Sequence, residues 1–472
     1  MNSKWSLLIF APLVLTANFL CAIEDYWNWN FMKSVSCQTF FDTAIHLPKN
    51  FIFGTATSAY QMEGNKTVHS TFIENSWTLE KFRPQAGIGN DHLNRFKKDI
   101  EFLQQLGIQM YRFSVDWSKI EPEEGKFDDQ MMMHYVAIAQ ECIKRGITPM
   151  VCLFHFVLPP WFMHKGGFEQ VENMRYFVRF AQFVFEHMVK ENVHWWMTYN
   201  EPIVYAFEGF FRGNLPPSKK NKLIVAGNVL KNMYNTHVEI AKFIKSRDAQ
   251  AQLGICHLMQ PLHPFHEYNL LEWAICKYFG RLTNDVTLEF FATGNFNWNY
   301  LVRGFNPDAP ASIDYMGINY YSHTIIKQNS LFEYPPLIIH DQGRRPQETM
   351  IGKTAMYPEG LYWAIEKAAQ VGKPIFITEN GVDDPVGDLR DEFIKKHLYA
   401  VSKAVNNGFD VRGYFYWSFV DSFNWNGGFD EKFGLCAVDY ENKTFACTVR
   451  KGSLPFVNFM RKRVGLQAIA SV

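Results

Sequence analysis

Two glutamates stand at the ends of two apolar, aromatic-rich runs of this 472-residue chain. Glu201 follows the run that ends in Thr-Tyr-Asn, and Glu379 follows the run that ends in Phe-Ile-Thr. Such runs are typical of buried strands, and the Pro202 and Gly381 that come shortly afterwards favour a turn. Barrel enzymes carry their catalytic groups at the carboxyl ends of parallel strands. Two facing carboxyls are the minimum for cleaving a glycosidic bond, so the sequence predicts an enzyme that hydrolyses a sugar linkage.

The elements that must position these glutamates alternate along the chain. Eight apolar runs are separated by stretches of helical periodicity, which predicts an α/β fold with a parallel sheet. Because parallel strands need crossovers, we expect a single (β/α)8 TIM barrel with elaborated loops at the C-terminal face of the strands. The strands are expected at residues 51–56, 109–115, 147–154, 193–199, 252–257, 313–319, 373–378 and 411–417, and helices at 91–106, 131–145, 171–190, 228–247 and 359–370.

Two segments of the predicted barrel are long and irregular in pattern. They span residues 262–314 and 327–351. Long loops inside a compact domain usually serve function. We therefore expect both segments to be loops over the barrel mouth.

The N-terminus has the pattern of a secretory signal peptide. Lys4 precedes an apolar run from Trp5 to Leu20, and the small residue Ala22 follows. Cleavage after Ala22 leaves residues 23–472 as one barrel domain, secreted or extracytoplasmic; the alternative is an uncleaved signal anchor. No other stretch is long and apolar enough to cross a membrane.

The composition excludes several other classes of protein. Lys+Arg and Asp+Glu both number 47, so the chain lacks the basic surplus that nucleic-acid binding needs. No Cys or His spacing indicates a metal site, and no cofactor is expected. Cys436 and Cys447 bracket a hairpin-like stretch and are candidates for a disulfide, as is Cys37 with some partner. The cysteines expected to be buried free thiols are Cys142, Cys152, Cys256 and Cys276.

The expected strand ends gather polar and aromatic side chains suited to a pyranose, which needs hydrogen bonds to its hydroxyls and a flat apolar face. Each has an ordinary alternative, such as an ion pair for Arg112, a helix cap for Asn200 or packing for the aromatic rings. Their shared position at the strand ends favours the functional interpretation. The set is Gln61, Glu63, Arg112, His155, Asn200, Glu201, Asn319, Tyr321, Glu379, Trp417, Asn424, Trp425 and Phe433.

From about Phe51 to Phe456 the chain resembles glycoside hydrolase family 1, the β-glucosidase-like enzymes with a (β/α)8 barrel. Each motif that carries this resemblance is short enough to occur by chance, but chance does not produce all of them in this order. They are the segments at 53–64 (FGTATSAYQMEG), 111–114 (YRFS), 200–202 (NEP), 314–321 (DYMGINYY), 377–381 (ITENG) and 413–418 (GYFYWS).

The resemblance implies a retaining exo-β-glycosidase that acts by double displacement on a small β-glycoside or an oligosaccharide. Glu379 is then the nucleophile and Glu201 the acid/base, with the two carboxyls about 5–5.5 Å apart. Arg112 and Tyr321 orient Glu379 and stabilise its charge. The implied substrate-binding residues are Gln61, His155, Asn200, Asn319, Tyr321, Trp417, Asn424, Trp425 and Phe433.

The chain departs from the family pattern at Asn424, where the family usually has a glutamate that bridges the 4- and 6-hydroxyls. This departure leaves the choice between glucose, galactose, fucose and other sugars open. The branch of the family that acts on 6-phosphorylated sugars pairs a similar change with a lysine and a tyrosine. Here the corresponding stretch is Glu431-Lys432-Phe433, and the acidic Glu431 opposes a phosphate.

Two other functions share most of these residues. One is a catalytically weak, sugar-binding or receptor-like relative, because a barrel tolerates the loss of its site. The other is a transglycosidase, which uses the same two carboxyls and passes the sugar to an acceptor other than water. The sequence leaves the oligomeric state open.

Overall fold

The computed structural model describes residues 40–469 except 329–336, 341–348, 352–353 and 388, and the side chains of 337–340 and 354 are also outside the description. The expected signal segment 1–22 and Cys37 lie outside the described residues. No helix in the described part of the chain is long and apolar enough to span a membrane.

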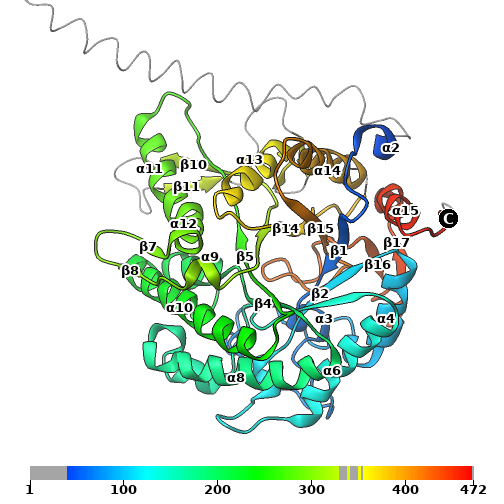
Figure 1. The fold of residues 1–472 in the computed structure, drawn as a ribbon, viewed down its shortest axis with the longest axis horizontal. Helices are drawn as coiled ribbons and strands as arrows, with labels where there is room; N and C mark the ends of the chain where they lie inside the picture. Colours follow the sequence, from blue (N-terminus) through cyan, green and yellow to red (C-terminus); the bar gives the residue numbers. More distant parts are fainter. Residues whose placement is uncertain (1–39, 329–336, 341–348, 352–353, 388, 470–472) are drawn as a thin grey trace, which may run out of the picture.

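Eight parallel strands close into a barrel at the centre of the molecule (Figure 1). Neighbours follow the order β1-β15-β14-β9-β5-β4-β3-β2, so the first and last strands pair with each other. This confirms the predicted TIM barrel. The strands are β1 (Ile52–Ala56), β2 (Met110–Ser114), β3 (Thr148–Cys152), β4 (Trp195–Asn200), β5 (Gln252–Leu258), β9 (Tyr315–Asn319), β14 (Ile375–Asn380) and β15 (Val411–Trp417).

Long helices surround the strands, as Figure 1 shows for α4, α6, α8 and α10. Their positions confirm the five helices predicted from periodicity, with ends that differ by a few residues. The start of α6 is stabilised by a side-chain cap, because the Asp128 carboxylate accepts a hydrogen bond from the Met131 N–H at 2.9 Å. The long helices are α4 (His92–Gln105), α6 (Asp129–Lys144), α8 (Met174–Met188), α10 (Leu223–Arg247), α13 (Pro358–Ala369), α14 (Arg390–Asn406) and α15 (Leu454–Arg463).

Shorter elements decorate the ends of the barrel. The short helices are α2 (Phe40–Ala44), α3 (Ala59–Glu63), α5 (Trp117–Ile120), α7 (Pro160–His164), α9 (Pro202–Phe207), α11 (Leu270–Gly280) and α12 (Val286–Thr293). The short strands are β6 (Leu262–Pro264), β7 (Asn295–Asn297), β8 (Arg303–Phe305), β10 (Thr324–Gln328), β11 (Leu337–His340), β12 (Met350–Ile351), β13 (Thr354–Ala355), β16 (Cys436–Val438) and β17 (Cys447–Val449).

The expectation that residues 262–314 form an irregular loop was wrong. This segment contains two helices, α11 and α12, and the antiparallel pair β7–β8. The Asn269 side chain caps α11 by accepting hydrogen bonds from the Leu271 and Glu272 N–H groups. The second expected loop, 327–351, lies partly outside the described residues.

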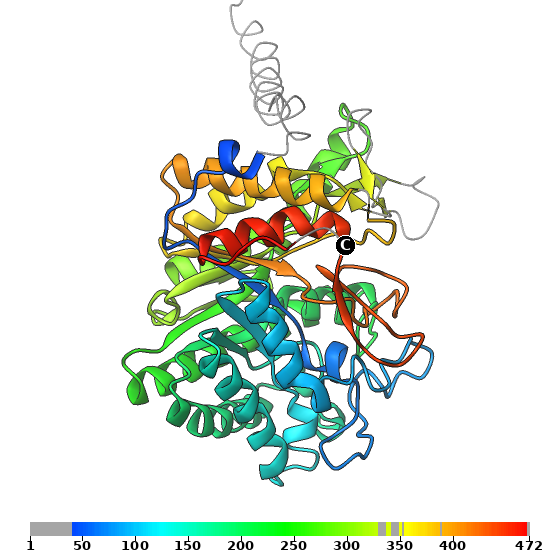
Figure 2. The same cartoon turned by 90° about the vertical axis from the view of Figure 1, so that its right-hand side faces the viewer.

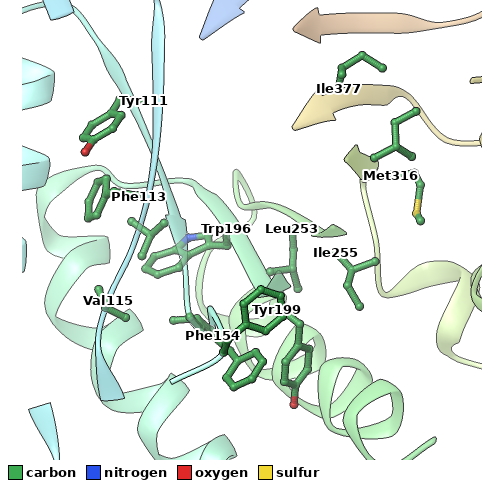
Figure 3. Packing of buried hydrophobic residues seen from close by; sticks show 14 of the residues in the cluster. Tyr111, Phe113, Val115, Phe154, Trp196, Tyr199, Leu253, Ile255, Met316 and Ile377 are labelled. Atoms are coloured by element: carbon green, nitrogen blue, oxygen red, sulfur yellow. The ribbon is translucent and has the colours of Figure 1, made fainter. Parts of the chain in front are cut away.

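Side chains alternate between the barrel interior and the layer beneath the helices. Figure 3 shows outward-facing residues of that layer, including Tyr111, Phe113, Trp196 and Leu253. The interior is filled by a second apolar cluster of Met110, Met150, Cys152, Met197, Cys256, Tyr315, Phe376 and Phe415. This cluster fills the barrel, so the interior is a packed core, and sites in such barrels lie at the carboxyl ends of the strands.

Glycine makes room for the large interior rings. A Cβ added to Gly254 of β5 would lie 2.4 Å from the Tyr315 ring, closer than any real contact. The Tyr315 hydroxyl donates to the main-chain oxygen of Trp196 at 2.8 Å, which fixes the ring in this space. A bulky interior aromatic and a glycine on the neighbouring strand therefore form one packing unit.

The candidate disulfide between Cys436 and Cys447 is not formed. Both are free thiols, as are Cys142, Cys152, Cys256 and Cys276, and this last set confirms the prediction. In the β16–β17 pair Cys436 lies opposite Val449 and Cys447 lies opposite Val438. Cys436 and Cys447 are thus diagonal neighbours, and the separation of about 7–8 Å that is typical of such pairs exceeds the roughly 4.4–6.8 Å between the Cα atoms of a disulfide.

The two ends of the described chain meet at the seam of the barrel. α15 lies beside α14, as Figure 2 shows in red and orange. Its fully buried Phe456 packs its ring against Phe41 of α2, Phe53 of β1 and Tyr414 of β15. The C-terminal helix therefore covers the junction of the first and last strands.

Candidate active site

Glu379 is brought to the barrel mouth by an irregularity in β14. Strict alternation that places Phe376 and Thr378 in the interior would point Glu379 outward. The register of β14 against β9 shifts between Ile377 and Glu379. Such a shift re-aims a side chain, and here Glu379 is 3% exposed and lines the cavity at the mouth.

Glu201 reaches the same cavity from the end of β4 through a register shift and a left-handed backbone conformation. The register of β4 against β5 shifts between Met197 and Asn200. Glu201 itself adopts the left-handed conformation, with φ 48° and ψ 57°, immediately before α9 begins at Pro202. Proline favours this first helical position, so the chain turns sharply and Glu201 remains at the mouth.

Glu379 is held by two donors, one on each carboxylate oxygen. The Arg112 guanidinium forms an ion pair with Oε1, and the Tyr321 hydroxyl donates to Oε2. Arg112 is fully buried and also donates to the Asn200 side-chain oxygen at 3.0 Å. Charge-assisted hydrogen bonds of this kind are strong and directional, so they fix the orientation of the carboxylate.

Glu201 lies in a different environment. Burial raises its pKa to about 8, and the nearby negative charge of Glu379 adds to the rise. A hydrogen bond from the Asn319 side-chain N–H to Oε1 at 2.7 Å acts in the opposite direction, as does the charge of Arg112. One carboxyl therefore faces a cation, while the other is kept protonated near neutral pH.

Two residues that the sequence analysis did not select set the direction of the Asn319 amide. The Cys256 thiol and the Thr378 hydroxyl both donate to Asn319 Oδ1, each at 2.8 Å. With its oxygen occupied from below, the amide must present its N–H groups to Glu201 and to Asn200. The side chains of Cys256 and Thr378 point inward because of the strand register, which no motif in the sequence reveals.

The cavity at the mouth has a volume of about 250 Å³. This is below the roughly 300–1,000 Å³ of pockets for drug-sized ligands, and it suits a single sugar ring. Most of the predicted site residues line it, while Arg112 and Asn319 lie beneath it and contact the two glutamates. The lining residues are Gln61, His155, Phe156, Asn200, Glu201, Tyr321, Glu379, Trp417, Asn424, Trp425, Asn426, Glu431 and Phe433.

Two polar side chains of the wall are oriented for a ligand. Gln61 accepts a hydrogen bond from Ser58 and donates to the Phe423 main-chain oxygen, both at 2.6 Å, which leaves one amide hydrogen for the cavity. Burial and the charge of Arg112 lower the pKa of His155 well below its ordinary value, so the ring is neutral. Its Nε2 accepts from Asn200 at 3.2 Å, and its Nδ1 has no hydrogen-bond partner among the described residues.

Aromatic rings provide flat faces on the same wall. His155 stacks with Trp417, with ring centroids 5.8 Å apart, and with Trp425 at 6.3 Å. Trp425 also stacks on the buried Tyr60 at 5.7 Å. These contacts hold the rings in place before any ligand arrives.

The structure separates one predicted residue from the site. Glu63 lies in a buried ion pair with Lys119 at 2.6 Å and accepts from the Tyr135 hydroxyl at 2.9 Å. Three lining residues were not predicted to contact a ligand: Phe156, Asn426 and Glu431. Phe156 and Asn426 adjoin the predicted residues His155 and Trp425, and this proximity was their only signal in the sequence. Glu431 was noted in the sequence only as an acidic residue that opposes a phosphate.

Comparison of the chain with known proteins identifies its family. The profile described as "Glycosyl hydrolase family 1" matches residues 43–463. The chain belongs to this family. Its curated relatives include "Beta-glucosidase A" of Thermotoga maritima, 29% identical over 434 residues, which are 84% of this chain and 94% of that protein.

The relatives differ in the sugars that they are named for. A "6-phospho-beta-galactosidase" of Clostridium acetobutylicum is 28% identical over 446 residues, 84% of this chain and 93% of that protein. Among solved structures, the "beta-glycosidase from Pyrococcus horikoshii" aligns with a TM-score of 0.79 and 31% identity, covering 90% of this chain and 97% of that one. The chain is thus a family 1 O-glycosyl hydrolase with a glycoside substrate, and the sugar is the open question.

Proposed function

We propose that the protein is a retaining exo-β-glycosidase of the β-glucosidase type, with Glu379 as nucleophile and Glu201 as acid/base. The observation that carries this proposal is the contrast between the two carboxyls of one cavity. Glu379 is ion-paired with Arg112, whereas burial raises the pKa of Glu201. Pairs of carboxyls whose environments differ in this way divide into nucleophile and acid.

In the first step Glu379 attacks the anomeric carbon from one face of the ring. Glu201, protonated at neutral pH, donates its proton to the leaving oxygen as the glycosidic bond breaks. Arg112 and Tyr321 hold the attacking carboxylate in position, so little reorganisation is needed in the transition state.

In the second step water releases the sugar. Esterification removes the negative charge of Glu379, and that charge is one cause of the raised pKa of Glu201. The pKa of Glu201 therefore falls in the glycosyl-enzyme, and the carboxylate accepts the proton of the attacking water. The Asn319 N–H at 2.7 Å stabilises this ionised form.

The shape of the site favours removal of one terminal sugar at a time. The cavity has room for a single ring, and its polar groups include the Gln61 amide and the His155 Nδ1. These donors suit the hydroxyls of a pyranose, while Trp417 and Trp425 offer faces for its apolar side. Transfer to a sugar acceptor instead of water would use the same groups.

A panel of aryl β-D-glucoside, galactoside, fucoside and mannoside tests the proposal. We expect turnover of at least one, and no turnover of any from pH 4 to pH 9 would favour a sugar-binding relative. Glu379→Gly should reduce turnover by at least about 10⁴-fold, and azide should restore it as an inverted glycosyl azide. Glu201→Ala should slow poor leaving groups far more than activated ones, because only poor leaving groups need the proton.

We also propose that the protein is exported, with residues 1–22 as its signal. The apolar run from Trp5 to Leu20 supports this proposal. N-terminal sequencing of protein recovered from the medium of the producing cell should begin at Ile23. Retention of Met1 on a membrane-bound protein would support the signal-anchor alternative.

A further inference from the structure

The loop that follows β15 builds the outer wall of the cavity. It contributes five lining residues: Asn424, Trp425, Asn426, Glu431 and Phe433. Glu201 and Glu379 line the same cavity from the ends of β4, which lies across the barrel from β15, and β14, which lies next to β15. If the anomeric carbon lies between those two glutamates, the end of the ring that carries the 4-hydroxyl and the C6 hydroxymethyl group faces this loop.

The Asn424 side chain is occupied in holding the loop together. Its amide nitrogen donates to the main-chain oxygens of Ser422 and Glu431, both at 3.2 Å. The main chains of Asn424 and Gly428 also exchange two hydrogen bonds, at 2.7 and 2.8 Å. Asn424 therefore offers the cavity at most a neutral amide oxygen.

Glu431 provides the wall with a carboxylate, and Gly427 provides the space for it. A Cβ added to Gly427 would lie 2.3 Å from Glu431 Cδ and 2.5 Å from Oε1. Gly427 is not among the residues with positive φ, so its backbone conformation does not require glycine. Its missing side chain instead allows the carboxyl group to fold over the loop.

The lining of the cavity is acidic. Glu201, Glu379 and Glu431 all line it, and none of the described lining residues is Lys or Arg. The next residue in the loop, Lys432, directs its Nζ to the Phe429 main-chain oxygen and lies over the Tyr440 ring. A carboxylate accepts hydrogen bonds from sugar hydroxyls strongly, and it repels a phosphate or carboxylate on the substrate.

We propose that Glu431, seated over Gly427, is the acidic acceptor for the hydroxymethyl end of the sugar, so that the site takes uncharged β-glycosides and rejects those phosphorylated or oxidised at C6. This inference rests on the proposed glycosidase function, because that function places the anomeric carbon between the two glutamates. It assigns to position 431 a role in specificity.

The test compares substrates that differ only at C6. For the wild type, Glu431→Gln and Gly427→Ala, kcat/KM is measured on aryl β-D-glucoside, on the xyloside (which lacks the hydroxymethyl group) and on the 6-phosphoglucoside. Both variants should lower the glucoside-to-xyloside ratio by about tenfold, the loss expected of one charge-assisted hydrogen bond. The exposed neighbour Asp430 provides the control, since Asp430→Asn removes the same charge and should leave the ratio unchanged.

A charge reversal sharpens the test. Glu431→Lys should raise the relative turnover of the 6-phosphoglucoside by about tenfold or more, because the lysine attracts what the glutamate repels. An equal loss on glucoside and xyloside in Glu431→Gln would show a merely structural residue and overturn the inference. A wild type that prefers the phosphorylated substrate would overturn it as well.

Binding distinguishes a failure of this inference from a failure of the glycosidase function. Calorimetry compares deoxynojirimycin with its analogue that lacks the hydroxymethyl group, and neither needs to be turned over. A wild type without turnover, whose affinity ratio nevertheless falls in Glu431→Gln, would contradict the function and support the role of Glu431. An unchanged ratio in an active enzyme would contradict only the role of Glu431.

Discussion

Two glutamates with the same chemistry acquire different properties from their neighbours. Glu379 receives Arg112 and Tyr321 on its two oxygens, while burial and the charge of Glu379 act on Glu201. Motifs in the sequence are sufficient to predict both glutamates and most of their partners. They do not reveal that Cys256 and Thr378 turn the Asn319 amide toward Glu201, because that contact depends on which strand residues point inward.

The raised pKa of Glu201 predicts the alkaline limit of activity. A general acid works only below its pKa, so kcat/KM should fall as the pH rises through about 8. Asn319→Ala removes a hydrogen bond that stabilises the ionised form, so this limb should move to higher pH. A pH profile of kcat/KM on one aryl glycoside measures the alkaline limb of the wild type and of Asn319→Ala. An alkaline limb that stays in place or moves to lower pH in Asn319→Ala would contradict the role of Glu201 as general acid.

At the scale of elements, alternating strands and helices were predictable, but the irregularities that aim the glutamates were not. A strict two-residue alternation predicts which face a strand residue occupies, and it fails at Glu379 because the β14 register shifts just before it. The segment 262–314 lacked a strong pattern, although it forms α11 and α12. Capping by Asn269 was the local signal that went unused.

The packing of Tyr315 against Gly254 leads to a stability prediction. Gly254→Ala places a Cβ 2.4 Å from the ring, and the strain should lower the free energy of unfolding by about 1–3 kcal/mol. Gly280→Ala is the matched control, because nothing lies within 4 Å of its added Cβ. Thermal unfolding of the two variants measures their midpoint temperatures. Equal midpoint temperatures for Gly254→Ala and Gly280→Ala would contradict the packing of Tyr315 against Gly254.

At the scale of the whole molecule, both ends of the chain complete one barrel. Phe456 of α15 contacts rings from α2, β1 and β15 across the seam. Phe456→Ala should therefore destabilise the protein by about 3–5 kcal/mol, yet leave the KM of the folded enzyme unchanged. Phe305→Ala is the control, since Phe305 is 66% exposed; an equal effect of the two changes on the denaturation midpoint would contradict this account of the seam.

The central claim is that Glu379 forms a covalent bond with the sugar while Glu201 handles the proton. The most direct measurement is to trap that bond with a 2-deoxy-2-fluoro-β-glycoside that carries a dinitrophenolate leaving group, and to map the label by peptide mass spectrometry. The account predicts one glycosyl unit per chain, esterified to Glu379. A label on another residue, or a first-formed product of inverted configuration, would contradict it.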